Sequence, residues 1–378
     1  MADAPTTDPA QAGLPTRRRD AVRHLLHTHR FQESVRLGTP PPVRNSALAG
    51  LQAALATALC VPLFLFSPWA HLVGFASLGA LVALFGRFAP RRSRTGIVLQ
   101  CAFWQTFAVF AMSATAWLGW PPAAQLILLA VSCGFYLLVC FRHRFGAPGP
   151  LIFIFAVGAA MTDTLDLTQV VERTLATALA ALVAWLICVA SEALRHPPTP
   201  ELPFPKDPER SLGELGFMAA RVAVAALVVV FASHALGLAH PAWAAMGAVA
   251  VMQGSHLHIS MHRALQRMTG TMVGAAFAWL LLAQQPSAWP ILAVLALLQI
   301  LTEIVIGLNY GLGQVLVTPM ALLMTHLAAP AAAGASLAPE RVADTLLGAL
   351  LGIAIAVALS SLEDRRQLAH HHQARLSG

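Results

Sequence analysis

Charged residues are scarce in this chain of 378 residues. They make up 11% of it, whereas about a quarter of a typical soluble domain is charged. Hydrophobic residues account for 57%, and the mean hydropathy is +0.67. A soluble chain of this length could not bury so much apolar surface, so a lipid bilayer must solvate most of it.

Lysine is almost absent, because Lys206 is the single lysine among 24 basic residues. The net charge is nevertheless +7, which could indicate either nucleic acid or an anionic membrane face as a partner. The arginines cluster beside apolar segments, and this placement favours the membrane. We therefore expect the lipid bilayer as a partner and no nucleic acid.

Catalytic and metal-binding motifs are also missing. There is no phosphate-binding loop, no GxSxG and no HExxH. The five cysteines lie inside apolar runs without metal-ligand spacing, which is typical of small buried hydrophobes. His256, His258 and His262 have no acidic or cysteine neighbour in sequence and indicate a polar turn. We expect no enzyme, catalytic residue, cofactor or metal.

Polar segments divide the chain into two apolar parts. Residues 1–42 are basic and lack the apolar core of a signal peptide, so they predict a cytoplasmic tail, either disordered or helical on the lipid surface. Residues 191–216 contain six prolines and predict a cytoplasmic linker. Residues 361–378 predict a second cytoplasmic tail.

The two apolar parts, residues 43–190 and 217–360, each contain six apolar segments. Several approach the roughly 20 residues that a membrane-spanning helix needs. The second, fifth, eighth and eleventh are short and carry Pro or Gly near their start, or Pro319 inside. The twelve predicted segments are 47–66, 69–85, 95–118, 123–141, 150–161, 174–190, 219–235, 242–252, 267–282, 289–308, 313–327 and 344–359.

The arginines predict the topology. Loops containing Arg87, Arg142 and Arg263 alternate with loops that have no arginine, while Arg173 and Arg341 are the exceptions on the other side. Because positive residues stay on the cytoplasmic side, both termini are expected there, and the number of spans is even. We predict an all-α integral membrane protein with about twelve transmembrane helices in the bacterial inner membrane.

The two parts also share short sequence pairs in the same order. Pro68-Trp69 parallels Pro241-Ala242-Trp243, Thr95-Gly96 parallels Thr269-Gly270, and Thr174-Leu175 parallels Thr345-Leu346. Such pairs predict a tandem duplication. Because each half has six spans, the two six-helix repeats would have the same orientation in the membrane.

Polar residues inside apolar segments are the candidates for function. Glu303 lies in the tenth segment, where an unpaired carboxylate costs about 2.5–3.5 kcal/mol. It either lines a pathway and couples transport to protons or pairs structurally with an arginine or with Gln299, one turn earlier. Arg263 and Arg267 are placed in a cationic turn that starts at His256, either as an anion-attracting mouth or as ordinary anchors.

Two charged residues at the outer end of the last segment have two possible interpretations. Arg341 and Asp344 predict either a salt bridge with helix capping by Asp344 or an outer gate. The small residues Gly270, Gly274 and Gly348 predict close helix packing.

The second half resembles the fusaric acid resistance (FUSC) and aromatic acid exporter family. The resemblance rests on HPAWA at 240–244, RALQRMTGT at 263–271 with Gly274, Tyr310-Gly311, and RVADTLLG at 341–348. It implies an inner-membrane exporter of aromatic or other weak organic acids. Longer relatives carry a large cytosolic domain where this chain has only residues 191–216. The first half matches more loosely, since Val170, Arg173 and Thr177 replace the Arg, Asp and Gly of the last motif.

Together these patterns predict secondary, proton- or potential-driven export of a small organic anion, with a periplasmic adaptor as an optional partner. The alternatives are a major-facilitator-like transporter, disfavoured because the loop GRFAPRRSRTG lacks an aspartate, and a membrane scaffold or envelope-stress protein without transport activity. The candidates for binding the anion are Arg263, Arg267, Trp243, Gln299, Tyr310 and Arg341. Glu303 is the proton-coupling candidate. The structural motif residues are Pro241, Gly270, Thr271, Gly274, Asp344, Thr345 and Gly348.

Overall fold

The computed structural model describes residues 42–90, 93–199, 203–204, 210–254, 257–328 and 336–360. The tails predicted at 1–42 and 361–378 and most of the predicted linker therefore lie outside the described residues, with only Pro42 of the first tail inside. The same holds for His256 and for the side chain of His258.

Every regular element in the described part of the chain is a helix, so the all-α fold is confirmed. The first half contains α3 (Val43–Leu65), α4 (Val73–Ala80, between the 3-10 turns Ala70–Leu72 and Leu81–Leu84), α5 (Arg94–Trp117), α6 (Pro122–Arg142), α7 (Leu151–Ala160) and α8 (Leu167–Ala190). After the 3-10 turn Glu192–Leu194, the second half contains α9 (Leu212–Ala235), α10 (Pro241–Met252), α11 (Leu257–Ala283), α12 (Ala288–Val305), α13 (Tyr310–Ala328) and α14 (Leu337–Ala358).

Seven of these helices are long and apolar enough to cross a membrane: α3, α5, α6, α8, α9, α12 and α14. Three of the four segments predicted to be short are short, since α7 and α10 have 10 and 12 residues and α4 is extended only by 3-10 turns. The fourth prediction is wrong, because α13 has 19 residues and continues through Pro319. On α3, Leu51, Leu55, Leu59 and Leu63 form an outward stripe that is 43–61% exposed. Such a stripe, at helical spacing, fits lipid chains as its solvent.

Helix caps explain why several helices begin earlier than the sequence predicts. Asp166 accepts from the backbone of Gln169 and starts α8, and Ser211 with Glu214 does the same for α9. These capping boxes satisfy backbone donors that the first turn leaves free. α14 begins at Leu337, so the alternative in which Asp344 caps this helix is wrong.

The predicted cationic turn from His256 to Arg267 is also wrong. α10 ends at Met252 and α11 begins at Leu257, so Arg263 and Arg267 both lie on α11. The 27 residues of α11 contain no proline to interrupt a helix. Arg267 is ten residues beyond the start of α11, roughly 15 Å along its axis.

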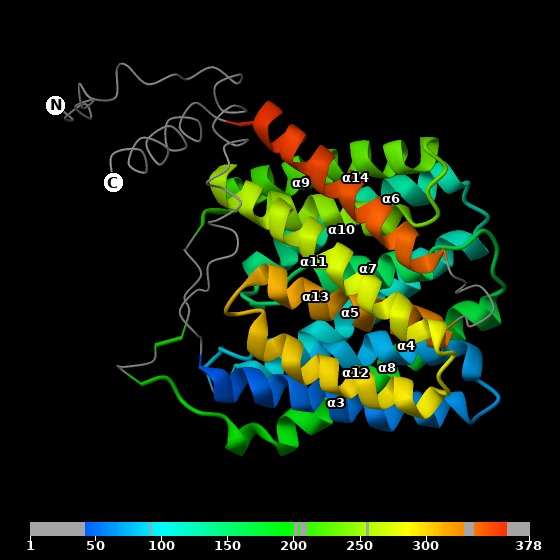
Figure 1. The fold of residues 1–378 in the computed structure, drawn as a ribbon, viewed down its shortest axis with the longest axis vertical. Helices are drawn as coiled ribbons and strands as arrows, with labels where there is room; N and C mark the ends of the chain where they lie inside the picture. The colour runs from blue at the N-terminus through cyan, green and yellow to red at the C-terminus, as the bar shows by residue number, and fades with distance from the viewer. Residues whose placement is uncertain are drawn as a thin grey trace.

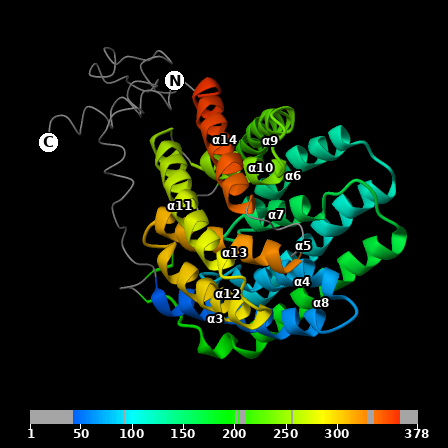
Figure 2. The same cartoon turned by 45° about the vertical axis from the view of Figure 1, so that its right-hand side comes forward.

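The helices gather in two groups with α11 and α13 between them (Figure 1). α3 and α12 run side by side along one edge in both views, and α9, α10 and α14 lie toward the other (Figure 2). The contacting pairs follow one pattern in both halves. In the first half they are α3–α4, α4–α8, α5–α7 and α5–α8, and in the second half they are α9–α10, α10–α14, α11–α13 and α11–α14.

Glycines allow the closest helix contacts in the second half. On α11, a Cβ added to Gly270 would lie 2.6 Å from Cβ of Gln314, and one added to Gly274 would lie 2.6 Å from the backbone oxygen of Val315. α10 and α14 meet at Gly247 and Gly348, where an added Cβ would reach the backbone of the other helix. These contacts hold α11 against α13 and α10 against α14, which positions the site described next.

Candidate functional site

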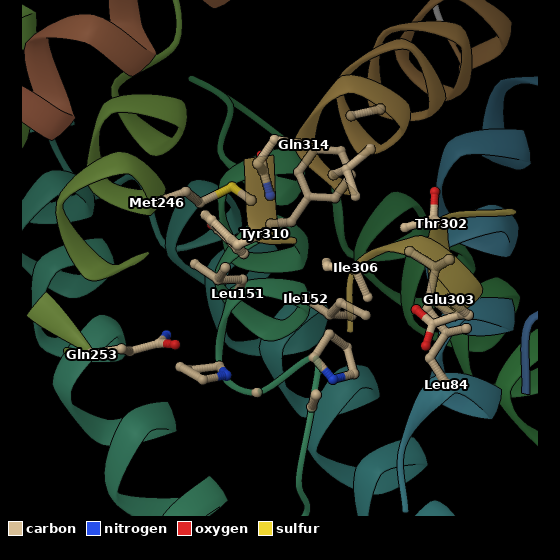
Figure 3. A pocket seen from close by; sticks show the side chains of 18 of the residues that line it. Leu84, Leu151, Ile152, Met246, Gln253, Thr302, Glu303, Ile306, Tyr310 and Gln314 are labelled. Carbon is tan, nitrogen blue, oxygen red and sulfur yellow. The ribbon is translucent and has the colours of Figure 1, made fainter. Parts of the chain in front are cut away.

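A cavity of about 430 Å³ lies inside the helix bundle. Residues of α10, α11, α12, α13 and α14 line it, together with the segment 146–152 and the end of the α4 region. Figure 3 shows Gln253 at one end and Thr302, Glu303 and Leu84 at the other, with Leu151 and Ile152 between them. The polar lining residues are Arg87, Gln253, Arg263, Arg267, Thr302, Glu303, Tyr310, Gln314 and Arg341.

Arg267 is buried on α11, with only 1% of its surface exposed. Its Nη1 donates to the Tyr310 hydroxyl at 3.0 Å and to Oε1 of Gln314 at 3.5 Å. Both partners belong to α13, which Gly270 and Gly274 allow to approach. Nε and Nη2 of Arg267 are buried and have no hydrogen-bond partner among the described residues. One edge of the guanidinium group is therefore held in place, and the other edge is unpaired.

Arg341 is equally buried, on α14. Its guanidinium carbon lies 4.9 Å from the centre of the Trp243 ring, and that ring stacks on His240 at 3.9 Å. Nε and Nη1 of Arg341 have no hydrogen-bond partner in the described part of the chain. Arg267 lies within electrostatic range of Arg341, so two buried cations share this part of the cavity.

Asp344 does not neutralise this pair by a salt bridge. Its Oδ1 accepts from the Ser233 hydroxyl at 3.1 Å, which ties α14 to α9. Oδ2 of Asp344 is buried without a partner among the residues that the structure describes. Within the same residues, no carboxylate forms a salt bridge with Arg267 or Arg341. The predicted salt bridge between Arg341 and Asp344 is therefore wrong, because Asp344 turns toward α9 instead.

Arg263 lies at the end of the cavity marked by Gln253. It is half-buried, and its Nη1 donates to Oε1 of Gln253 at 3.4 Å. Its guanidinium carbon lies 5.9 Å from the centre of the Tyr310 ring. Tyr310 thus contacts Arg263 through its ring and Arg267 through its hydroxyl.

Arg87 and Glu303 form a buried ion pair on the wall near Leu84. Their side chains are 7% and 5% exposed. Arg87 belongs to the first half and Glu303 to the end of α12, so the pair joins the two halves of the chain. Glu303 therefore lines the cavity and is paired with an arginine at the same time.

Two other buried arginines, Arg94 and Arg195, lie away from the cavity and have several acceptors nearby. Arg94 donates to Oε1 of Gln52 and to the backbone oxygens of Phe85 and Ala83, and its Nη1 lies 3.8 Å from Glu192. Arg195 donates to the same Glu192 at 2.7 Å. These arginines hold loops and helix ends together. Arg94 and Arg195 each leave one buried nitrogen without a hydrogen-bond partner among the described residues, whereas Arg267 and Arg341 each leave two.

Several residues that the sequence predicted for the site or its structural motif do not line the cavity. Trp243 is buried beside Arg341 but does not line the cavity. Gln299 donates from Nε2 to the Thr57 hydroxyl at 2.9 Å, a contact between α12 and α3. Pro241 occupies the first turn of α10, and Thr271 and Thr345 are buried in helix contacts.

The sequence reasoning missed Arg87, Gln253 and Gln314 as cavity residues. Gln253 and Gln314 do carry a signal, because each is a polar residue beside or within an apolar segment. Arg87 carries none, since the positive-inside pattern already accounts for an arginine in that loop.

The seven apolar helices make this chain a multi-pass membrane protein. Residues 225–355 match the model of a family described as fusaric acid resistance protein-like, which confirms the resemblance over that segment. Over 130 residues the chain is 32% identical to the uncharacterized membrane protein YvaC of Bacillus subtilis (strain 168), a match that covers 33% of this chain and 21% of that protein. No solved structure matches the chain. The segment that matches the family includes Arg263, Arg267 and Arg341.

Proposed function

We propose that the protein is a secondary transporter that exports aromatic or other weak organic acids across the inner membrane. One observation carries the proposal: Arg267 and Arg341 lie buried in a cavity within the helix bundle and form no salt bridge with any described residue. Burying an uncompensated charge costs several kcal/mol. Asp344 offsets part of this cost at Arg341 from a distance, and a bound organic anion would supply a direct negative partner for both arginines.

The rest of the lining suits an organic body attached to that anion. Met246, Leu151, Ile152 and Phe155 supply apolar surface near the polar groups. Ligand sites of this kind are mostly apolar with a few placed polar groups, and their volumes run from about 300 to 1,000 Å³. A single aromatic ring with a carboxylate fits that description.

The arginine topology supports export as the direction of transport. Both termini would be cytoplasmic, which places Arg263 at the inner mouth, where it raises the local concentration of anions. No nucleotide-binding motif is present in the sequence, so the proton gradient or the membrane potential would drive export. Glu303 would carry the coupling proton and release Arg87 when protonated.

Two tandem six-helix repeats, with twelve spans, fit this function. The matching pattern of helix contacts in the two halves supports the duplication. Transporters with parallel repeats place their substrate site between the halves, near the middle of the membrane. The cavity is lined from both halves, by Arg87 and Leu151 on one side and Arg267 and Arg341 on the other.

The alternatives fit these observations less well. The buried ion pair of Glu303 with Arg87 would suit a scaffold, but a scaffold would gain nothing from a polar cavity with two unpaired cations, and its helix interface would be dry. A major-facilitator-like transporter would need an aspartate in the loop that contains Arg87. A periplasmic adaptor is compatible with the proposal but not required by it.

The direct test is transport of organic acids by the full chain. The protein would be expressed in a bacterial host deleted for its own acid exporters. Growth would be measured in the presence of inhibitory concentrations of benzoate, 4-hydroxybenzoate or phthalate. We expect resistance to at least one acid, lost when Arg267 and Arg341 are both changed to Gln. Arg142→Gln serves as the matched control, because Arg142 is exposed and does not line the cavity. No protection against any acid, from a protein shown to be in the membrane, would refute the proposal.

A further inference from the structure

We propose that Arg267 is a carboxylate anchor and that Tyr310 and Gln314 are the residues that position it. The inference rests on the proposed function and goes further, because it names the chemical group that the site recognises and the atoms that recognise it. A site that used charge alone would need only a cation. This site presents a cation whose orientation is held by neighbouring side chains.

The two unpaired nitrogens of Arg267 lie on one edge of its guanidinium group. Nε and Nη2 point their N–H groups in parallel, in the fork that matches the two oxygens of a carboxylate. Both nitrogens are buried and without a partner among the described residues. A planar anion with two oxygens can therefore give each donor its own acceptor atom, whereas a halide ion offers both donors a single atom.

The opposite edge of the same guanidinium group is occupied. Nη1 donates to the hydroxyl of Tyr310 and to Oε1 of Gln314. These two residues are one helical turn apart on α13, so they reach Arg267 from the same side. Together they fix the plane of the group and leave the Nε–Nη2 edge buried and without a partner among the described residues, so an anion that binds there must displace the side chains packed against it.

The close approach of α11 and α13 makes this arrangement possible. Gly270 lies one turn beyond Arg267, and its missing side chain leaves room for Gln314 and the backbone of Gly311. A larger residue at 270 would move Gln314 away from Arg267. The spacing Arg267, Gly270, Gly274 is therefore part of the anchor, in addition to its packing role.

Arg341 adds a second set of donors to the anchor. Its Nε and Nη1 are unpaired among the described residues, and its guanidinium group is held against the Trp243 ring. A carboxylate has about four lone-pair sites, enough to accept hydrogen bonds from both arginines. Asp344 forms no salt bridge with Arg341, although it lies within electrostatic range of it, and its Oδ1 accepts from Ser233.

Calorimetry on the purified full chain in lipid nanodiscs tests this assignment, with benzoate as the probe and benzamide as its neutral isostere. We expect wild type to bind benzoate and to bind benzamide at least tenfold more weakly. Arg267→Lys keeps the charge and loses the fork, so it should weaken benzoate binding about tenfold or more, as expected for one charged hydrogen bond. Arg142→Lys should bind benzoate as wild type does.

Tyr310→Phe removes one support of the fork and should weaken benzoate binding several-fold. Its matched control is Tyr136→Phe, at the other tyrosine of the chain, whose hydroxyl bonds to the backbone of Trp104 away from the cavity. If Tyr310 acts through Arg267, the effect of Tyr310→Phe should vanish in the Arg267→Lys background. An effect of equal size in both backgrounds would assign Tyr310 a merely structural role and overturn its part in the anchor.

Two outcomes overturn the anchor itself while leaving organic-acid transport untouched. One is that Arg267→Lys binds benzoate as tightly as wild type, which would mean that charge alone suffices. The other is that wild type binds benzamide as well as benzoate. Each variant is first checked for its elution volume and melting temperature. If Arg267→Lys does not fold, Tyr310→Phe and Gln314→Met still test the fork, since neither changes the charge.

Discussion

Arg87 and Glu303 are separated by 216 residues in sequence and form a buried ion pair on the wall of the cavity. The pair is the only salt bridge in the described part of the lining, where three further arginines stand without a carboxylate partner. The cavity is therefore cationic as a whole, and its single acidic side chain is already engaged. Any bound anion must compete with Glu303 for Arg87 or bind the other arginines.

The first prediction concerns proton coupling at Glu303. Glu303→Gln removes the titratable group, so export driven by an imposed pH gradient should lose its dependence on that gradient. The measurement is flux of a labelled aromatic acid from vesicles at several pH gradients. Glu172→Gln is the control, because Glu172 is partly exposed and contacts His71, away from the cavity. Unchanged pH dependence in Glu303→Gln would show that this residue carries no coupling proton.

The second prediction concerns the stability of the same pair. Removing one partner leaves a buried charge uncompensated, which typically costs about 3–5 kcal/mol. Glu303→Gln should therefore lower the melting temperature, and the double variant with Arg87→Gln should recover most of the loss. Thermal unfolding in detergent measures both. A double variant less stable than either single variant would mean that the two residues do not act as a pair.

The third prediction concerns the contact between α11 and α13. Gly270→Ala adds a Cβ that would lie 2.6 Å from Cβ of Gln314, and overpacking of this kind costs about 1–3 kcal/mol. The control is Gly96→Ala, at the parallel sequence position of the first half, where no described atom lies within 4 Å of an added Cβ. Thermal unfolding should separate the two variants clearly. Equal melting temperatures would argue against a close contact between α11 and α13 at Gly270.

The fourth prediction concerns pH and His240, which precedes α10. Burial lowers the pKa of His240 below its ordinary value of 6.5, Glu340 opposes this shift, and Arg341 adds to it. The folded state therefore disfavours the protonated form. His240 makes no pH-dependent contribution well above pH 6.5, and it costs stability as the pH falls below that value.

His240→Gln should accordingly show a smaller loss of melting temperature than wild type between pH 7.5 and 5. The variant also loses the stacking on Trp243, but that loss is the same at every pH. Differential scanning fluorimetry of both proteins across this range makes the comparison. A steeper loss in the variant would mean that the folded state stabilises the charged form of His240 and raises its pKa instead of lowering it.

Local sequence patterns were enough to predict where most helices lie. The apolar runs predicted α3, α5, α6 and α12 to within four residues at either end, because a membrane helix must satisfy its own backbone and needs a long apolar surface. The patterns failed at helix starts where polar residues cap or extend a helix, as at Asp166 and Leu257. Hydropathy does not detect the hydrogen bonds by which polar side chains cap the first turn of a helix, so it places the helix start too late.

The site residues were likewise predicted only in part from the sequence. Glu303 could be selected from the sequence because a carboxylate is expensive inside a membrane. Arg263 and Arg267 were selected as a cationic turn, Arg341 as the outer end of the last segment and Tyr310 as part of the family motifs, and all five line the cavity. Gln299, selected as a polar residue one turn from Glu303, and Trp243, selected from the HPAWA motif, contact Thr57 and Arg341 instead. The free-energy cost of burying a polar group shows that the residue needs a partner. It does not show which residue that partner is.

The sequence by itself thus determined that the chain is a helical membrane protein whose second half carries arginines beside its apolar segments. Only the tertiary structure decided that Arg87 pairs with Glu303, whereas Arg267 keeps one edge of its guanidinium group unpaired among the described residues. The physical reason is that pairing depends on which helices pack together. Residues far apart in sequence meet only when glycines such as Gly270 let α11 and α13 come close enough to bring Arg267, Tyr310 and Gln314 into contact.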